Sequence, residues 1–164
     1  MSLSLLKRFR TSLRRPNLKA RARPGAELRI AITAERIVLS SGTEMDVAPR
    51  EDNAPEWQPA IDAFEKILPA LKGKEAGVVL ADRFVRYALL PWSDTLKTHD
   101  QWLGLARHRF TAIHGPVAAE WEIKFAETAP AGPRLACAAD AGLIEELGAR
   151  AVAHQVRLVS VVPF

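Results

Sequence analysis

The sequence is poor in the glycine patterns on which nucleotide-binding sites depend. Its nine glycines are scattered over 164 residues, whereas a phosphate-binding loop needs closely spaced glycines between a strand and a helix. Lys72-Gly73-Lys74 follows a predicted helix instead of preceding one, and this position favours a helix C-cap over a phosphate site. The sequence therefore predicts no nucleotide site and no other cofactor.

Metal ligands and nucleophiles are equally scarce. The single cysteine, Cys137, cannot form an internal disulfide, which fits a reducing compartment, and its apolar surroundings in RLACAAD predict an inert core residue. His108 and His114, the nearest pair within one predicted helix, are six residues apart and lie on different faces. There is no G-x-S-x-G motif either, so we expect a protein that is not an enzyme and holds no metal. The four histidines are His99, His108, His114 and His154.

Long apolar runs are also missing. The longest, residues 76–81 and 158–164, are far below the roughly 18 residues that a membrane-spanning helix needs. The N-terminal segment mixes charges with apolar residues and has no small-residue cleavage site. We therefore expect no transmembrane helix and no secretory signal, and a cytoplasmic location is the default expectation.

Acidic residues are absent from the first 26 positions, which hold eight basic residues. The rest of the chain has 15 basic and 19 acidic residues, so a mildly acidic body carries a basic arm. We expect residues 1–26 to form a flexible arm that is attracted to phosphate on anionic lipid or nucleic acid, or that contacts a partner. A solvated tail without a specific role is the alternative. The basic residues are Lys7, Arg8, Arg10, Arg14, Arg15, Lys19, Arg21 and Arg23.

Residues 27–164 have the periodicities of a single domain in which strands alternate with helices. LRIAIT and RIVLS surround a tight reversal at Ala34 and Glu35, which predicts a β-hairpin, and a polar loop with room for a short strand near residues 45–48 follows. Apolar side chains then recur at steps of three and four, which predicts a helix that ends near Gly73. These side chains are Trp57, Ala60, Ile61, Phe64, Ile67, Leu68 and Leu71.

The segment VVLADRFVRYALLPW predicts a second hairpin over residues 77–90, with Ala81, Asp82 and Arg83 at its bend. A helix follows, for which Thr98 and Asp100 suit the amino end and Gly115 with Pro116 marks the carboxyl end. Its buried face is expected to contain Leu103, Ala106, Phe110 and Ile113.

The last third of the chain predicts two strands, a helix and a closing strand. AAEWEIKFAE alternates apolar with charged residues, and RLACAA is a short apolar strand. Asp140 suits the cap of a helix that places Leu143, Leu147 and Ala151 on one face, and VRLVSVVPF suits a strand covered on both faces. The order ββ-α-ββ-α-ββ-α-β indicates an α/β fold, a mixed sheet flanked by helices.

The four tryptophans have different expected roles. Trp57, Trp102 and Trp121 lie at apolar or helix-packing positions and are predicted to be core residues. Trp92 follows Pro91 at the end of the second hairpin, and we consider it a candidate anchor for a protein partner because exposed tryptophans are frequent interface hot spots.

These elements resemble a known family. From residue 76 to residue 164 the chain is similar to the actin-like (RNase H-like) cytoplasmic domains of type IV pilus assembly and type II secretion platforms, the PilM-like and GspL-like proteins. The resemblance rests on GVVLADRFVRYALLPW, WLGLARHRFTAIHG, RLACAADAGLIEELGARA and the closing VRLVSVVPF. The resemblance implies the first lobe of an actin-like fold, with a mixed sheet of about five strands. It also implies that the protein is a bacterial cytoplasmic scaffold that binds the cytoplasmic tail of an inner-membrane assembly protein.

Two departures from that family bear on function. Actin-like ATPases carry a glycine-containing phosphate turn at the first hairpin, where this chain has Ala81-Asp82-Arg83. By the same resemblance, we expect the second lobe to be absent. Nucleases of this type hold two metal ions between several carboxylates. Asp82 has only Glu127 and Asp140 as candidate companions, so we interpret Asp82 as a turn residue.

Two functional hypotheses follow. The first is a non-enzymatic assembly module that binds a partner's cytoplasmic tail and lies in the cytoplasm or on the inner face of the membrane. The second is a nucleic-acid-binding or vestigial nuclease protein that uses the basic arm on phosphates.

Overall fold

The computed structural model describes residues 28–126 and 132–164. The predicted basic arm and Glu127 lie outside the described residues. The elements are β1 (Leu28–Ile32), β2 (Arg36–Leu39), β3 (Glu44–Asp46), α2 (Gln58–Ile67), the 3-10 helix η1 (Leu68–Leu71), β4 (Glu75–Leu80), η2 (Asp82–Phe84), β5 (Val85–Leu90), α3 (His99–His114), η3 (Pro116–Glu120), β6 (Trp121–Phe125), β7 (Arg134–Asp140), α4 (Ala141–Ala153) and β8 (Arg157–Pro163).

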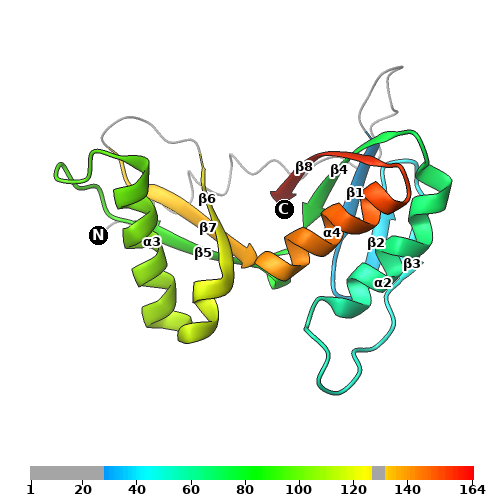
Figure 1. The fold of residues 1–164 in the computed structure, drawn as a ribbon, viewed down its shortest axis with the longest axis horizontal. Coiled ribbons are helices and arrows are strands. Elements are labelled where there is room, and N and C mark those ends of the chain that lie inside the picture. The colour runs from blue at the N-terminus through cyan, green and yellow to red at the C-terminus, as the bar shows by residue number, and fades with distance from the viewer. Residues whose placement is uncertain (1–27, 127–131) are drawn as a thin grey trace.

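A mixed five-stranded sheet in the order β3-β2-β1-β4-β8 forms one part of the structure (Figure 1). β1 and β2 are the predicted hairpin, with Ile32 opposite Ile37, and β3 extends it as a third antiparallel strand. β4 pairs in parallel with both β1 and β8. The predicted mixed sheet and the predicted order of helices and strands are confirmed.

The prediction of a second hairpin over residues 77–90 is wrong. β4 belongs to the five-stranded sheet, whereas β5 is the edge of a separate antiparallel sheet in the order β5-β7-β6. The turn of η2 separates the two strands and sends the chain from one sheet into the other. The burial patterns explain this: β4 is buried along both faces from Ala76 to Leu80, which is typical of a central parallel strand, whereas β5 is only partly covered.

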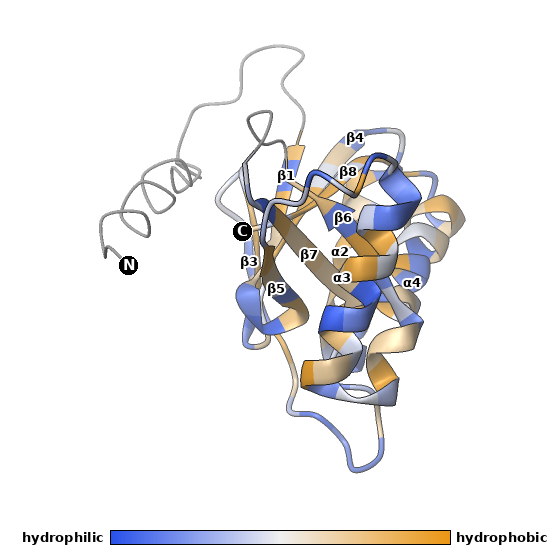
Figure 2. Ribbon diagram, turned by 90° about the vertical axis from the view of Figure 1, so that its left-hand side faces the viewer, coloured by the Kyte–Doolittle hydropathy of each residue, from blue (hydrophilic) through white to orange (hydrophobic). Residues whose placement is uncertain are grey.

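The helices cover one side of the sheets. α2 and α4 pack on the five-stranded sheet around Ile30, Phe64 and Leu147, and α3 packs on the three-stranded sheet around Trp102 and Phe110. Figure 2 shows the helices together on one side of β5 and β7. Each sheet therefore has its own hydrophobic cluster, and β7 joins the two parts because it continues directly into α4.

The predicted helix ends are confirmed. Thr98 and Gln101 form a capping box at the start of α3, and the chain leaves that helix through Gly115, whose φ of 79° favours glycine. Asp140 caps α4 by accepting a hydrogen bond of 2.8 Å from the backbone N–H of Gly142. These local signals set where the helices lie along the chain, but they do not determine how the strands pair.

The predicted burial of Ile113 and of both faces of β8 is wrong. Ile113 is 57% exposed, because it lies in the last turn of α3, beyond the buried stripe of Trp102, Ala106 and Phe110. β8 is not covered on both faces: it is the last strand of the five-stranded sheet in the described part, and its Val162 is 44% exposed. An apolar sequence alone does not distinguish this end strand from the central β4.

Candidate functional site

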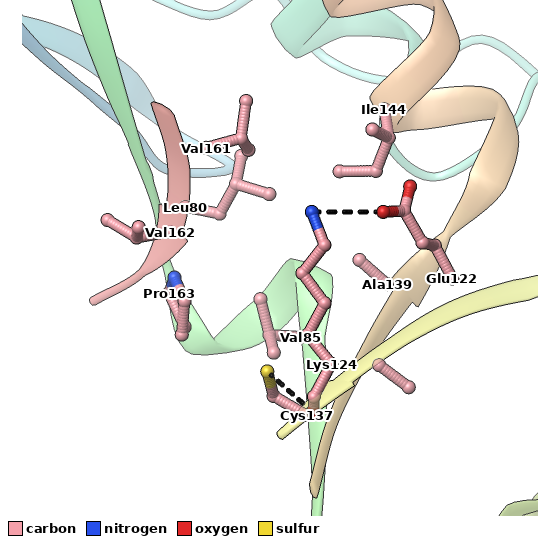
Figure 3. Close-up of a pocket in the computed structure, with 11 residues that line it drawn as sticks. Leu80, Val85, Glu122, Lys124, Cys137, Ala139, Ile144, Val161, Val162 and Pro163 are labelled. Carbon is pink, nitrogen blue, oxygen red and sulfur yellow. Dashed lines mark hydrogen bonds and ion pairs between the residues drawn. The ribbon is translucent and has the colours of Figure 1, made fainter. Parts of the chain in front are cut away.

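A small apolar pocket lies where the two sheets meet, and we call it the junction pocket (Figure 3). It has a volume of about 50 Å³. The ends of β4 and β8 form one wall, the face of the three-stranded sheet away from α3 forms the other, and Ile144 of α4 closes one end. The lining residues are Leu80, Val85, Glu122, Lys124, Cys137, Ala138, Ala139, Ile144, Val161, Val162 and Pro163.

The polar groups of the junction pocket come from β6. Lys124 Nζ and Glu122 Oε1 form an ion pair of 3.0 Å, and Figure 3 shows the Lys124 side chain projecting between the two walls. These two residues lie two apart on a strand and so project from the same face. An aliphatic hollow beside one ammonium and one carboxylate suits the binding of a side chain better than the transformation of a substrate.

Cys137 lies in this pocket and is half-buried instead of fully in the core. Its thiol donates a hydrogen bond of 3.5 Å to the carbonyl oxygen of Lys124. Burial raises the pKa of the Cys137 thiol, so the neutral form is favoured and the residue is a poor nucleophile. This agrees with the predicted inert role.

A second hollow, of about 200 Å³, lies on the helix side of the same junction, and we call it the helix-side hollow. Its polar edge is an ion cluster, in which Glu56 contacts Arg83 at 2.8 Å and Arg86 at 4.0 Å. Glu56 precedes α2 whereas the two arginines belong to η2 and β5, so the cluster ties the two parts of the structure together. The other lining residues include Pro55, Trp57, Phe84, Val117, Trp121, Asp140 and Leu143.

Trp57 fits tightly in the wall of the helix-side hollow. A Cβ atom at Gly142 would lie 3.1 Å from Trp57 Cζ2 and 3.1 Å from Asp140 Oδ1, so only glycine fits without a shift. Trp57 Nε1 is buried and has no hydrogen-bond partner within residues 28–126 and 132–164. Of the three tryptophans predicted to be core residues, Trp102 is fully buried, whereas Trp57 and Trp121 are half-buried at this junction.

Asp82 is a turn residue, as predicted. It opens η2, and its Oδ1 accepts a hydrogen bond of 3.1 Å from the hydroxyl of Tyr87. Burial and the neighbouring Asp82 carboxylate raise the pKa of the Tyr87 hydroxyl. Asp140 is engaged as the cap of α4, and within residues 28–126 and 132–164 no three His, Cys, Asp or Glu side chains converge on a point where they could hold a metal ion.

The histidines are spread over the structure. His99 lies edge-on to Phe125 at 5.5 Å between ring centroids, and His114 lies 5.0 Å from Trp121. His154 Nε2 lies 3.6 Å from a carboxylate oxygen of Glu65. Each of these three rings therefore has a separate structural neighbour.

Trp92 is 45% exposed, and its ring centroid lies 6.1 Å from that of the buried Trp102. The guanidinium of Arg134 lies over the other tryptophan ring, 4.7 Å from the centroid of Trp102. Through its ring contact with Trp102, Trp92 lies against the hydrophobic cluster of the three-stranded sheet. The interface role of Trp92 stays a prediction.

Sequence reasoning missed the junction itself. Its walls come from β4, β5, β6, β7, β8 and α4, and they meet only because the chain builds two sheets instead of one. The one local signal was the alternation in WEIKF, which placed Glu122 and Lys124 on the same strand face.

Comparison with known proteins identifies solved structures with a similar fold. No protein-family model and no curated protein sequence matches the chain. Among solved structures, the cytoplasmic domain of EpsL, an inner-membrane component of the type II secretion system of Vibrio cholerae, has a TM-score of 0.59 at 10% identity over 83% of this chain and 56% of that one. A chain of the PilM-PilN type IV pilus biogenesis complex has a TM-score of 0.50 at 16% identity over 81% of this chain and 46% of that one.

A third structure, from Bacteroides thetaiotaomicron, is a protein with an actin-like ATPase fold and unknown function. It has a TM-score of 0.44 at 10% identity over 82% of this chain and 51% of that one. The match spans about half the length of all three structures.

The resemblance seen in the sequence is confirmed at the level of the fold: the chain shares its fold with the cytoplasmic domain of EpsL and with a chain of the PilM-PilN complex. Two of the similar structures are components of type II secretion and type IV pilus assembly. In the part of the chain that the structure describes, no helix is both long and apolar enough to cross a lipid bilayer.

Proposed function

We propose that this protein is a non-enzymatic assembly module that binds the cytoplasmic tail of an inner-membrane partner in a secretion or pilus platform. The observation that carries the proposal is the fold shared with the EpsL cytoplasmic domain, an inner-membrane component of a secretion system. A cytoplasmic location, on the inner face of the membrane when the partner is bound, is part of this proposal.

The junction is the surface proposed for the tail. Binding sites are typically concave and mostly apolar, with a few polar groups that fix orientation. The junction pocket has this character, with Lys124 and Glu122 as its charged groups. An extended peptide that runs between the two sheets would place an aliphatic side chain in the pocket and a polar or charged group beside Lys124 or Glu122.

The proposal is tested by filling the junction pocket. Ala139 lines it from β7, and Ala139→Leu adds three carbon atoms to a hollow of about 50 Å³. The probes are synthetic peptides that represent the cytoplasmic tails of inner-membrane proteins encoded beside this chain, titrated by calorimetry against the full chain. We expect one tail to bind and Ala139→Leu to weaken it at least about tenfold, or about 1.4 kcal/mol.

The matched control is Ala149→Leu, which makes the same change at an exposed position of α4. Circular dichroism must show both variants folded. Tail binding that Ala139→Leu leaves unchanged would place the partner elsewhere, and hydrolysis of ATP by the purified chain would contradict a non-enzymatic role.

A further inference from the structure

Three of the four edge strands in the described sheets carry a feature that discourages pairing with another chain. β3 has only three residues and places Glu44 and Asp46 at the edge of its sheet. β8 contains Pro163, which lacks an N–H donor, and β6 carries the charged pair Glu122 and Lys124. The fourth edge, β5, is different.

β5 is a six-residue edge strand without an internal proline or lysine, and it reads VRYALL. Its one charged residue, Arg86, is tied back to the chain by hydrogen bonds from its guanidinium to the carbonyl oxygens of Arg83 and Val85. Tyr87 is 40% exposed and Leu89 is 50% exposed, both on the face away from α3. An apolar edge of this kind normally pairs with another strand.

The backbone of β5 has a defined set of open groups. The N–H of Ala126 donates to the carbonyl of Leu135, so Leu135, Cys137 and Ala139 of β7 direct their backbone groups to β6. The alternate residues of β7 then bond Arg86, Ala88 and Leu90 of β5, and Val85, Tyr87 and Leu89 direct their groups outward.

Among the residues that the structure describes, two of these outward residues have no partner for their outward backbone groups. The N–H of Val85 already donates to the carbonyl of Asp82, and the carbonyl of Val85 accepts from Arg86 Nη1 at 3.3 Å. Tyr87 and Leu89 therefore supply the outward donors and acceptors, one N–H and one C=O from each. Ala88 lies midway between them.

We propose that two copies of this chain pair through β5 in antiparallel fashion, about a twofold axis at Ala88. In this register Tyr87 of each copy lies opposite Leu89 of the other, and the four open groups of each copy form four hydrogen bonds between the copies. The two three-stranded sheets become one six-stranded sheet. The proposal concerns self-association and does not depend on the proposed binding of a partner's tail.

The side chains suit this register. Ala88 faces Ala88 of the second copy as a pair without direct hydrogen bonds, where Cβ atoms come closest and a small residue is needed. Tyr87 packs against Leu89 across the new strand pair, a favourable aromatic and aliphatic combination. Arg86 faces Leu90, so like charges do not oppose each other.

The first test measures the oligomeric state of the full chain by sedimentation velocity between about 1 µM and 0.1 mM. We expect a monomer–dimer equilibrium in the wild type. Leu89→Lys introduces a typical edge-protecting residue at the interface, and we expect it to weaken dimerisation at least tenfold. Val152→Lys introduces a lysine in the same way at an exposed apolar residue of α4 and should leave the dimer intact.

The second test is crosslinking, which does not depend on weakening the fold. Ala88→Cys in a Cys137→Ser background places one thiol beside its symmetry mate, at a separation that a disulfide can bridge. We expect an oxidised dimer on a non-reducing gel from Ala88→Cys but not from Val152→Cys in the same background. A wild type that stays monomeric to 0.1 mM, a dimer that Leu89→Lys does not affect, or the absence of the Ala88→Cys crosslink would overturn the proposal.

Discussion

At the scale of single residues, one ion cluster joins the two helices of the five-stranded sheet. Arg150 of α4 contacts Glu65 of α2 at 2.6 Å and Glu146 of its own helix at 3.1 Å. His154 Nε2 lies 3.6 Å from the other oxygen of the same Glu65 carboxylate. The hydrogen bond from Arg150 lowers the pKa of Glu65 below its ordinary value of 4.5. Because these groups are partly exposed, solvent screens the interaction and its contribution is modest.

This cluster predicts a dependence of stability on pH. A carboxyl group whose pKa is lowered by folding stabilises the folded state above its unfolded pKa, and that contribution is lost as the pH falls through the folded pKa. We expect Glu65→Gln to reduce the free energy of unfolding at pH 7 and to make little difference near pH 3. Urea unfolding at the two pH values measures this, with Glu145→Gln, an exposed change on α4, as the control. An equal loss at both pH values would contradict the role of the charge.

At the scale of elements, α3 depends on its capping box. The hydroxyl of Thr98 accepts from the N–H of Gln101 at 3.3 Å, and the Gln101 side chain accepts from the N–H of Thr98 at 3.0 Å. We expect Thr98→Ala to lower the free energy of unfolding by about 1 kcal/mol. Thermal or urea unfolding measures the loss, and Thr111→Ala, at an exposed position of the same helix, should cost less. An equal effect of the two changes would show that the cap contributes nothing.

The elements also show which parts of the fold were predictable. Helix ends depend on residues within one turn of each other, so Thr98, Gly115 and Asp140 could be recognised from the sequence. Strand partners depend on residues far apart in the chain. The segments on either side of Asp82 suit a hairpin locally, but β4 finds parallel partners in β1 and β8, and β5 pairs with β7. The junction pocket could not be predicted, because it exists only where these separate pairings meet.

At the scale of the whole molecule, the chain combines an acidic body with basic residues at its N-terminus. The total charge of +4 becomes −4 when the eight basic residues of positions 1–26 are removed. Each basic group near an anionic membrane contributes about 1 kcal/mol, and this attraction is screened by salt. We propose that residues 1–26 hold the protein against anionic lipid, with nucleic-acid phosphate as the competing ligand.

Deletion of residues 1–26 is expected to abolish sedimentation with vesicles of phosphatidylglycerol and phosphatidylcholine. The full chain should sediment with these vesicles at low salt and dissociate from them as the salt concentration is raised. It should not sediment with vesicles of pure phosphatidylcholine. A chain of full length in which the eight basic residues are changed to glutamine separates charge from length and should behave like the deletion. Retention on anionic vesicles by either variant would contradict the membrane role of the arm.

Binding of the full chain to a single-stranded oligonucleotide in the presence of competing anionic vesicles would favour the nucleic-acid hypothesis instead. In that case the same basic residues prefer nucleic-acid phosphates to lipid phosphates.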